Sequence, residues 1–325
     1  MKSHTKSHTK RHTKSHTKSH TKRHTKRHTK RHTKRQTKRQ KGGNARLQME
    51  LYNACENGDL LKVQQLVKNN PDIDISGNNE QAFRNACNNF HLEVAKWLLE
   101  QKPDINISIN NEEVFRKASY NGLIQTAQWL LEQKPDINIS AKNDESFRIA
   151  CIRRHLSFAK WLLLIKPDID ISANNEEAFR TVCGFGHLEV AKWLLLIKPD
   201  INISANNEEA FRNACKSNKL EVAKWLLLVK PKINVSANND EAFRHACSHG
   251  NLEIAKLLLQ FKPRLNMSSC TNKTILTELK KMQEMRLRQQ TLPLLAASEF
   301  GRDKTKSGTL SKLNSDVARQ ISEYI

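Results

Sequence analysis

The sequence predicts an all-α solenoid of helix-turn-helix repeats with short hairpin loops and a period of 32 residues. The first observation is that single residue types recur at this spacing over residues 44–269, in seven copies. The second is that each copy holds two apolar segments of helical length. A unit this short cannot bury its apolar face alone, so a fixed period in this range indicates stacked repeats. The recurring residues are Phe83, Phe115, Phe147, Phe179, Phe211 and Phe243; Trp97, Trp129, Trp161, Trp193 and Trp225; and Pro71, Pro103, Pro135, Pro167, Pro199, Pro231 and Pro263.

One unit, ANNEEAFRNACKSNKLEVAKWLLLVKPKINVS, shows the elements in order. In the first helix, Asn206 can serve as the N-cap and Glu209 can complete a capping box. The second helix, LEVAKWLLLV, is apolar around most of its circumference, which is typical of a helix packed between neighbours. It ends at Lys230, because a residue before proline avoids the helical region. INVSANN then alternates and turns, as a short extended hairpin does.

Six of the seven cysteines occupy one position of the repeat, and Ser119 fills the same position in the third copy. Exchange of serine and cysteine at one site indicates a small buried side chain. Helices that pack side by side lie about 8–10 Å apart, whereas a disulfide requires Cα atoms within about 7 Å. We therefore expect free thiols in a reducing compartment.

This pattern resembles the ankyrin repeat. AFRNAC stands where that family usually has T-P-L-H-x-A-A, LEVAKWLL looks like its second helix, and KPDINIS looks like its A-D-V-N-A. The unit departs from the family in being one residue shorter than 33, in lacking the Thr-His pair and in lacking the usual hairpin glycine. The repeated sequence KPDINISANNEEAFR is similar to the repeats in the ankyrin arrays of giant DNA viruses. That resemblance implies a viral protein that acts in the host cytoplasm or nucleus.

The sequence favours a binding module over an enzyme. An enzyme needs unlike residues that converge on one point, and the repeated Arg84, Arg116, Arg148, Arg180, Arg212 and Arg244 are identical instead. We interpret them, with the repeated Glu113, Glu177 and Glu209, as ion pairs that connect one repeat to the next; a charged binding stripe is the alternative. No Cys/His set has the spacing of zinc ligands. We expect no catalysis, no cofactor and no metal.

Positions that differ between copies are the candidates for specificity, and they cluster late in the first helix and in the turn after it. In ankyrin arrays these positions contribute to the concave side, which usually docks a protein, so the resemblance implies a partner site here. Drift at unconstrained surface positions is the alternative. We expect Tyr120, Ile152 and Phe185 to be exposed there. The candidate partner-binding residues are Asn89, Tyr120, Asn121, Ile152, Arg153, Phe185, Lys216 and His249.

The second helices differ in another way. One surface position is Glu100 and Glu132 in early copies and then becomes Leu164, Leu196 and Leu228. The next position changes in parallel from glutamine to Ile165, Ile197 and Val229. We predict an exposed apolar ridge that marks an interaction surface, unless the flanking tail segments cover it.

The N-terminal residues 1–43 form a basic tail with histidine, threonine, lysine and arginine on a four-residue beat. Residues 1–41 hold 17 of the 55 basic side chains and no acidic one, so most of the net charge of +22 belongs to this tail. No apolar stripe would fix a helix here, and we expect disorder. Cations without acids bind polyanions, so a nucleic-acid arm or a nuclear address ranks before a metal site.

The end of the chain is predicted to be a polar capping helix over residues 270–290 and a segment over 291–325 that ends in an amphipathic helix. That helix weakly resembles the F-box-like ending of poxviral ankyrin proteins, L-P-x-E-I-x-x-x-I-x-x-Y-L, which recruits a ubiquitin ligase. The matching residues are Leu313, Asp316, Val317, Ile321 and Tyr324, and the proline is absent. A terminal helix docked on the array is the alternative.

The sequence thus predicts a monomeric, non-enzymatic protein-protein interaction scaffold whose partner it does not name. The alternatives are a substrate adaptor for a ubiquitin ligase and a nucleic-acid-associated factor that acts through the tail. No apolar run approaches the roughly 20 residues of a membrane helix, and the N-terminus lacks the apolar region of a secretory signal. We therefore expect an intracellular protein without membrane attachment.

Overall fold

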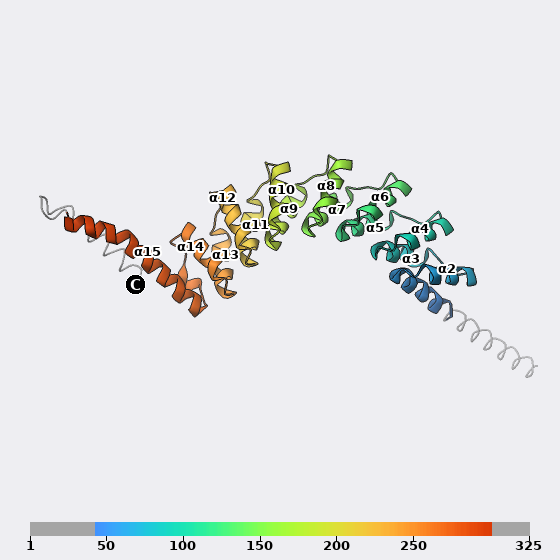
Figure 1. The fold of residues 1–325 in the computed structure, drawn as a ribbon, viewed down its shortest axis with the longest axis horizontal. Helices are drawn as coiled ribbons and strands as arrows, with labels where there is room; N and C mark the ends of the chain where they lie inside the picture. Colours follow the sequence, from blue (N-terminus) through green and yellow to red (C-terminus); the bar gives the residue numbers. More distant parts are fainter. Residues whose placement is uncertain (1–42, 301–325) are drawn as a thin grey trace, which may run out of the picture. The chain divides into compact units, whose positions relative to one another are not determined.

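The computed structural model describes residues 43–300, with side chains described up to residue 292. Every regular element among these residues is a helix, and none is a strand (Figure 1). No helix in this part of the chain is long and apolar enough to cross a bilayer. The chain divides into two compact units, and the boundary follows Ala141.

The first unit contains three pairs of helices, each pair separated from the next by a loop. Its elements are a helix over residues 43–57, α2 (Leu60–Asn69), α3 (Gly77–Asn88), α4 (Leu92–Gln101), α5 (Ile109–Asn121) and α6 (Ile124–Gln133). The pairs repeat at the predicted spacing of 32 residues, which confirms the helix-turn-helix organisation.

The second unit continues the same alternation with four pairs and a terminal helix. Its elements are α7 (Ala141–Ile152), α8 (Leu156–Ile165), α9 (Ala173–Phe185), α10 (Leu188–Ile197), α11 (Ala205–Lys216), α12 (Leu220–Val229), α13 (Ala237–Ser248), α14 (Leu252–Phe261), the 3-10 helix η1 (Met267–Ser269) and α15 (Lys273–Phe300).

The core is built from the residues that recur. The phenylalanine of the first helix is buried in all six copies that have it, as Phe83 and Phe211 illustrate, and Leu51 is buried at the same position of the first copy. The phenylalanine ring packs against a tryptophan of the next repeat's second helix: the Phe179 and Trp225 ring centroids are 6.3 Å apart. Burial of a large aromatic side chain in a contact between repeats contributes to stacking as well as to each unit.

The cysteines lie in the small slot that the sequence predicted. All seven are free and buried. Burial raises the pKa of Cys55 to about 12, and it raises the pKa of Cys183 as well. In the third copy, Ser119 fills the slot and donates its hydroxyl to the Phe115 carbonyl at 3.1 Å. The six thiols of the repeated slot therefore stay protonated and serve as small apolar side chains.

The start of the first helix differs from the predicted capping box in six of the seven copies. The second to fourth residues of the helical segment have left-handed backbone angles, as in Asn206 (φ 53°), Asn207 (φ 59°) and Glu208 (φ 61°). Asn206 does not cap the helix; its side-chain amide donates to the Glu209 carboxylate at 2.9 Å. The loop before it consists of turns rather than paired strands. Asparagine tolerates the left-handed region, but glutamate there costs about 1–2 kcal/mol.

The left-handed turn places its acidic residue under the loop that ends the same repeat and leads into the next one. The buried Glu208 carboxylate accepts the backbone N–H of Asn234 at 3.2 Å. Its second oxygen, Oε2, is buried without a hydrogen-bond partner. The same contact recurs within each unit, between Asn106 and Glu80, Asn138 and Glu112, Asp170 and Asp144, and Asn202 and Glu176. A bond that recurs in five copies offsets the cost of the strained turn and of carboxylate burial.

The last repeat is covered by α15. Ile275 and Leu279 of this helix are buried, and the Asn272 side chain accepts the Ile275 N–H at 3.2 Å as an N-cap. Most other side chains of α15 up to residue 292 are exposed or half-buried. The helix runs ten residues past the predicted end at residue 290.

Replacing the buried glutamate should show how much the loop contact contributes. Glu208→Ala is expected to lower the free energy of unfolding by about 1–3 kcal/mol, because the Asn234 N–H loses its acceptor. Urea unfolding of the full chain measures the change. The matched control is Glu221→Ala on the exposed strip of α12, which should stay within about 0.5 kcal/mol of wild type. Equal effects of the two changes would contradict the role of Glu208.

Candidate partner-binding surfaces

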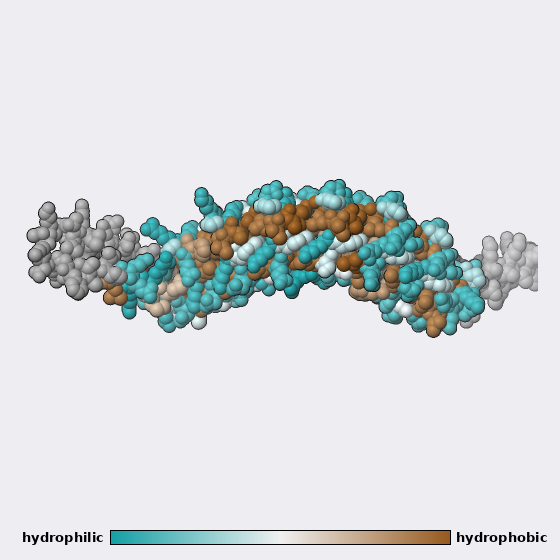
Figure 2. Space-filling view, turned by 45° about the horizontal axis from the view of Figure 1, so that its top comes forward, coloured by the Kyte–Doolittle hydropathy of each residue, from teal (hydrophilic) through white to brown (hydrophobic). Residues whose placement is uncertain are grey.

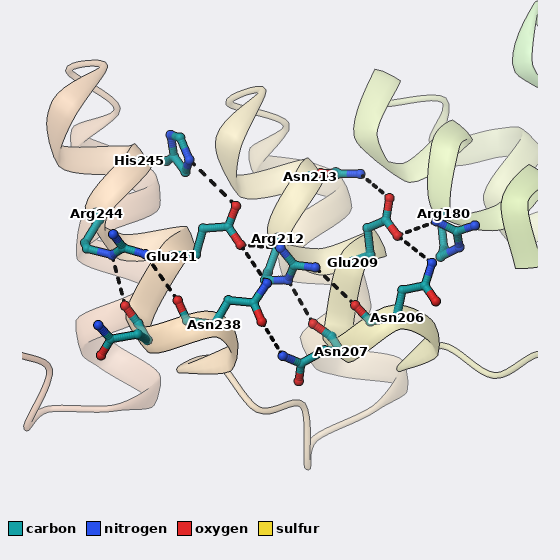
Figure 3. A network of polar contacts seen from close by, with 11 residues as sticks. Arg180, Asn206, Asn207, Glu209, Arg212, Asn213, Asn238, Glu241, Arg244 and His245 are labelled. Carbon is teal, nitrogen blue, oxygen red and sulfur yellow. Dashed lines mark hydrogen bonds and ion pairs between the residues drawn. The ribbon is translucent and has the colours of Figure 1, made fainter. Parts of the chain in front are cut away.

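The repeated arginines are structural, as one of the two interpretations predicted. In the second unit, Arg212 donates Nε to the Asn207 carbonyl at 2.8 Å and Nη2 to the Asn206 carbonyl at 3.1 Å. Its Nη1 pairs with the Glu241 carboxylate of the next repeat (Figure 3). One guanidinium therefore satisfies the carbonyls of its own left-handed turn and binds the following repeat.

The same pairing occurs at other steps within each unit. In the first unit, the Arg84 guanidinium lies 3.1 Å from the Glu113 carboxylate. In the second unit, Arg148 pairs with Glu177 at 3.0 Å, and Arg180 pairs with Glu209. Glu241 occupies the same slot as these glutamates, which its place on the repeat could have shown from the sequence. These arginines and glutamates are committed to stacking and are poor candidates for a binding stripe.

The arginine–glutamate pairs between repeats, which we call the ladder, change the pKa values of three carboxyl groups. Burial raises the pKa of Glu209, but the Asn206 hydrogen bond and the charge of Arg180 outweigh it, so the net pKa is lowered. The pKa values of Glu113 and Glu241 are lowered in the same way, against a rise from burial. A carboxyl group whose pKa is lower in the folded state stabilises that state above its ordinary pKa. This stabilisation is lost as the pH falls through the folded-state pKa.

Acid titration of stability should expose this contribution. The combined variant Glu113→Gln, Glu209→Gln, Glu241→Gln should be less stable than wild type at neutral pH and lose less stability between about pH 5 and pH 3. Urea midpoints across this range measure both effects. The control Glu93→Gln, Glu221→Gln, Glu253→Gln changes exposed helix residues and should keep the wild-type acid loss. If the triple variant at Glu113, Glu209 and Glu241 also loses as much stability in acid as wild type, these ion pairs do not contribute to the free energy of unfolding.

The turn between the two helices has a left-handed residue in all seven copies. Four copies use glycine, and the others use Phe90 (φ 70°), Arg154 (φ 65°) and Asn218 (φ 55°). The slot therefore has a left-handed backbone in every copy, which phenylalanine and arginine adopt only with strain. Arg154 also lies near His187 of the next repeat, and burial and then the Arg154 charge lower the pKa of His187.

The predicted partner-binding residues divide into two groups. The exposed ones are Tyr120, Arg153, Phe185, Lys216 and His249. Ile152 is half-buried, against the expectation that it is exposed. Asn89 and Asn121 are also half-buried, and their side chains donate to the backbone carbonyls of Asn85 and Asn88. In each unit taken by itself, we call the exposed residues of this set the turn face, and Phe90 belongs to the turn face of the first unit.

Phe90 is the residue that the candidate set missed. Its side chain is 58% exposed even though its backbone is left-handed. The first unit thus has two exposed aromatic residues at these turns, Phe90 and Tyr120, and the Lys117 ammonium lies 5.3 Å from the centre of the Tyr120 ring. In the second unit the Phe185 ring packs on His187 at 5.8 Å between centroids. The sequence signal for this residue was that Phe90 stands at a position where four other copies have glycine.

Removing the strain should stabilise the fold. Phe90→Gly and Arg154→Gly are each expected to raise the free energy of unfolding by about 0.5–1 kcal/mol. Arg154→Gly should also raise the pKa of His187, which an NMR titration follows. Gly250→Ala is the converse control, because its φ is 79° and no atom lies within 4 Å of the added Cβ; it should lose about 1–2 kcal/mol. A loss of stability in both glycine variants would mean that these side chains are packed.

The apolar ridge lies on the second helices of the second unit. Leu164, Leu196 and Leu228 are between 76% and 79% exposed, and Ile165, Ile197 and Val229 are between 37% and 39% exposed. Figure 2 shows apolar side chains gathered over the region of α8, α10 and α12. The leucine slot changes to Gln260 on α14, where Phe261 continues the second row and is 51% exposed.

Two of the predicted sites lie outside the described residues. These are the basic tail over residues 1–41 and the F-box-like set Leu313, Asp316, Val317, Ile321 and Tyr324. Both stay predictions. Within residues 43–292, no group of three or more histidine, cysteine, aspartate or glutamate side chains could hold a metal ion.

Comparisons with known proteins agree with the repeat pattern. The model of the family described as "Ankyrin repeats (3 copies)" matches residues 51–143, 147–239 and 211–304. No curated protein sequence matches the chain. Among solved structures, the human ASB11 ankyrin repeat domain is similar, with 17% identity, a TM-score of 0.44 and coverage of 59% of this chain and 95% of that one. The ankyrin repeat domain of Bcl-3, described as a unique member of the IkappaB protein family, has 19% identity, a TM-score of 0.41 and coverage of 59% and 90%.

The family model covers well over half of the chain, and the helix pairs, the loops and the buried repeat positions fall within it. Arrays of this kind are scaffolds for protein–protein interaction. The chain belongs to the ankyrin-repeat family.

Proposed function

We propose that the chain is a scaffold without catalysis of its own, and that it binds a protein partner through the turn face. The observation that carries this proposal is the exposure of aromatic side chains there, Phe90 and Tyr120 in the first unit and Phe185 in the second. Aromatic residues contribute much of the energy at protein interfaces. The phenylalanines of the repeated slot are buried in the core instead.

Polar side chains support the same site. Lys216 and His249 are exposed at the ends of the first helices of two later repeats. The His249 ring lies 5.5 Å from the His245 ring, and Ser248 lies between them in sequence and is 2.9 Å from His249 Nδ1. An interface usually has an aromatic centre and a polar rim, and residues that vary between copies can select one partner.

The viral resemblance, the intracellular location and the monomeric state stay predictions. The same holds for the adaptor role through the C-terminus and for nucleic-acid binding through the tail. No observation on the described residues favours either role over partner binding by the array.

Site-specific cross-linking tests the proposal directly. A photoreactive phenylalanine analogue at Tyr120 or at Phe185 should give a covalent adduct with a distinct protein in the cells that make the chain. The same analogue at Glu253, on the exposed strip of α14, is the control and should give none. Tyr120→Ser with Phe185→Ser should reduce capture of that protein at least tenfold, about 1.4 kcal/mol. Adducts of equal yield at all three positions would contradict the turn face as the site.

A further inference from the structure

The apolar ridge is not required by the fold. The slot that holds Leu196 in the second unit holds Glu100 in α4 and Glu132 in α6, and these helices fold in the same way. The leucine side chains are more than three-quarters exposed, so they add little to the core. A contiguous row of large exposed apolar side chains is unusual on a monomer and marks an interaction site. The ridge is separate from the turn face, so its occupant is a separate question.

The charges around the ridge have a definite arrangement. Lys160, Lys192 and Lys224 are exposed one helical turn before the leucines and form a parallel row. On the other side, lysine and aspartate alternate in close pairs, such as Lys166 with Asp168 at 2.9 Å and Lys198 with Asp200 at 3.0 Å. The ridge therefore has a row of lysines on one side, of which Lys224 also pairs with Glu221 at 3.1 Å, and lysine–aspartate pairs on the other.

These charges oppose two occupants from within the chain. Residues 1–41 carry 17 basic side chains and no acidic one, and residues 301–325 carry five basic and three acidic ones. Both terminal segments are basic and would be repelled by the lysine row. In a two-fold pairing whose axis crosses the ridge, the lysine row would face lysines of a second copy, which like-charge repulsion disfavours. A pairing whose axis runs along the ridge would set the lysine row against the lysine–aspartate pairs, and sedimentation tests for it below.

A lipid surface fits less well than a protein segment. Glu189 and Glu221 lie on the same exposed strip as the lysines, and Asp168 and Asp200 lie on the opposite flank. An anionic bilayer would meet these four carboxylates together with the lysines, so the charges of this surface do not select a bilayer. A protein segment can instead place its own acidic side chains opposite the lysine row alone.

We propose that the apolar ridge docks an amphipathic helix of a partner protein, with an apolar stripe that is flanked on one side by a row of carboxylates. The helix would run across α8, α10 and α12. Packed helices lie about 8–10 Å apart, and seven residues of a helix rise about 10.5 Å. An apolar residue at every seventh position of the partner therefore meets one repeat after another. The half-exposed Ile165, Ile197 and Val229 form the second wall of the contact, and Phe261 lies at its end.

A designed peptide tests this docking on the full chain. The probe is a labelled helix of about 21 residues with leucines at heptad a and d positions, glutamates at e and alanine or glutamine elsewhere; its twin has lysines at e. Fluorescence anisotropy in about 0.3 M salt suppresses attraction to the basic tail, which is common to all variants. Wild type should bind the glutamate probe at least tenfold more tightly than the lysine probe.

Two sets of variants identify the site. Leu164→Gln, Leu196→Gln, Leu228→Gln should weaken binding of the glutamate probe at least tenfold; Leu196→Gln alone serves if the triple variant does not fold. Lys160→Glu, Lys192→Glu, Lys224→Glu should reverse the preference between the two probes. Glu100→Gln with Glu132→Gln is the matched control and should bind as wild type does. Tyr120→Ser with Phe185→Ser should also leave binding unchanged, which separates this result from the turn face.

Three results would overturn the proposal. The first is that wild type does not bind the glutamate probe, or that the leucine variant binds it as tightly as wild type does. The second is a wild-type dimer in sedimentation that the leucine variant abolishes, because the occupant is then a second copy. The third is leucine-dependent binding to phosphatidylserine vesicles without any binding of the glutamate probe, because the occupant is then a lipid surface.

Discussion

In five of the seven copies, a buried carboxylate joins the start of a repeat to the loop that ends it and leads into the next repeat, and the rest of the array depends on this bond. Glu208 reaches the Asn234 N–H only because three residues before the first helix proper turn in the left-handed sense. That turn is strained, and Arg212 stabilises it by binding two of its carbonyls while it also pairs with the next repeat. The residues that are identical between copies are therefore those that set the geometry of stacking.

This commitment leaves two kinds of surface free to differ. The ends of the first helices hold side chains such as Tyr120 and Phe185 outside the stacking contacts, and the strip of the second helices holds Leu196 away from the core. Stability in a repeat protein is close to a sum over units and their interfaces. Substitutions on these surfaces can therefore change binding with little change in the fold. Phe90 is an exception, because its exposed ring is attached to a strained backbone.

The sequence alone was enough for the period, the helix pairs, the buried phenylalanine and cysteine slots and the exposed leucine row, because each follows from spacing and side-chain type. It was misleading at the helix start. Asn206 and Glu209 fit a capping box, and only the backbone angles show that Asn206 belongs to a left-handed turn. The half-burial of Ile152 and the carbonyl contacts of Asn89 and Asn121 depend on packing that a repeat comparison does not contain.

Native-state hydrogen exchange measures the central bond most directly. The amides of Asn106, Asn138, Asp170, Asn202 and Asn234 belong to exposed loop residues, yet each N–H is bound to a carboxylate at the start of the same repeat. The account predicts that these five amides exchange far more slowly than free loop amides, with opening free energies that match those of the adjoining helices. Exchange at the intrinsic rate of an unprotected amide would contradict it.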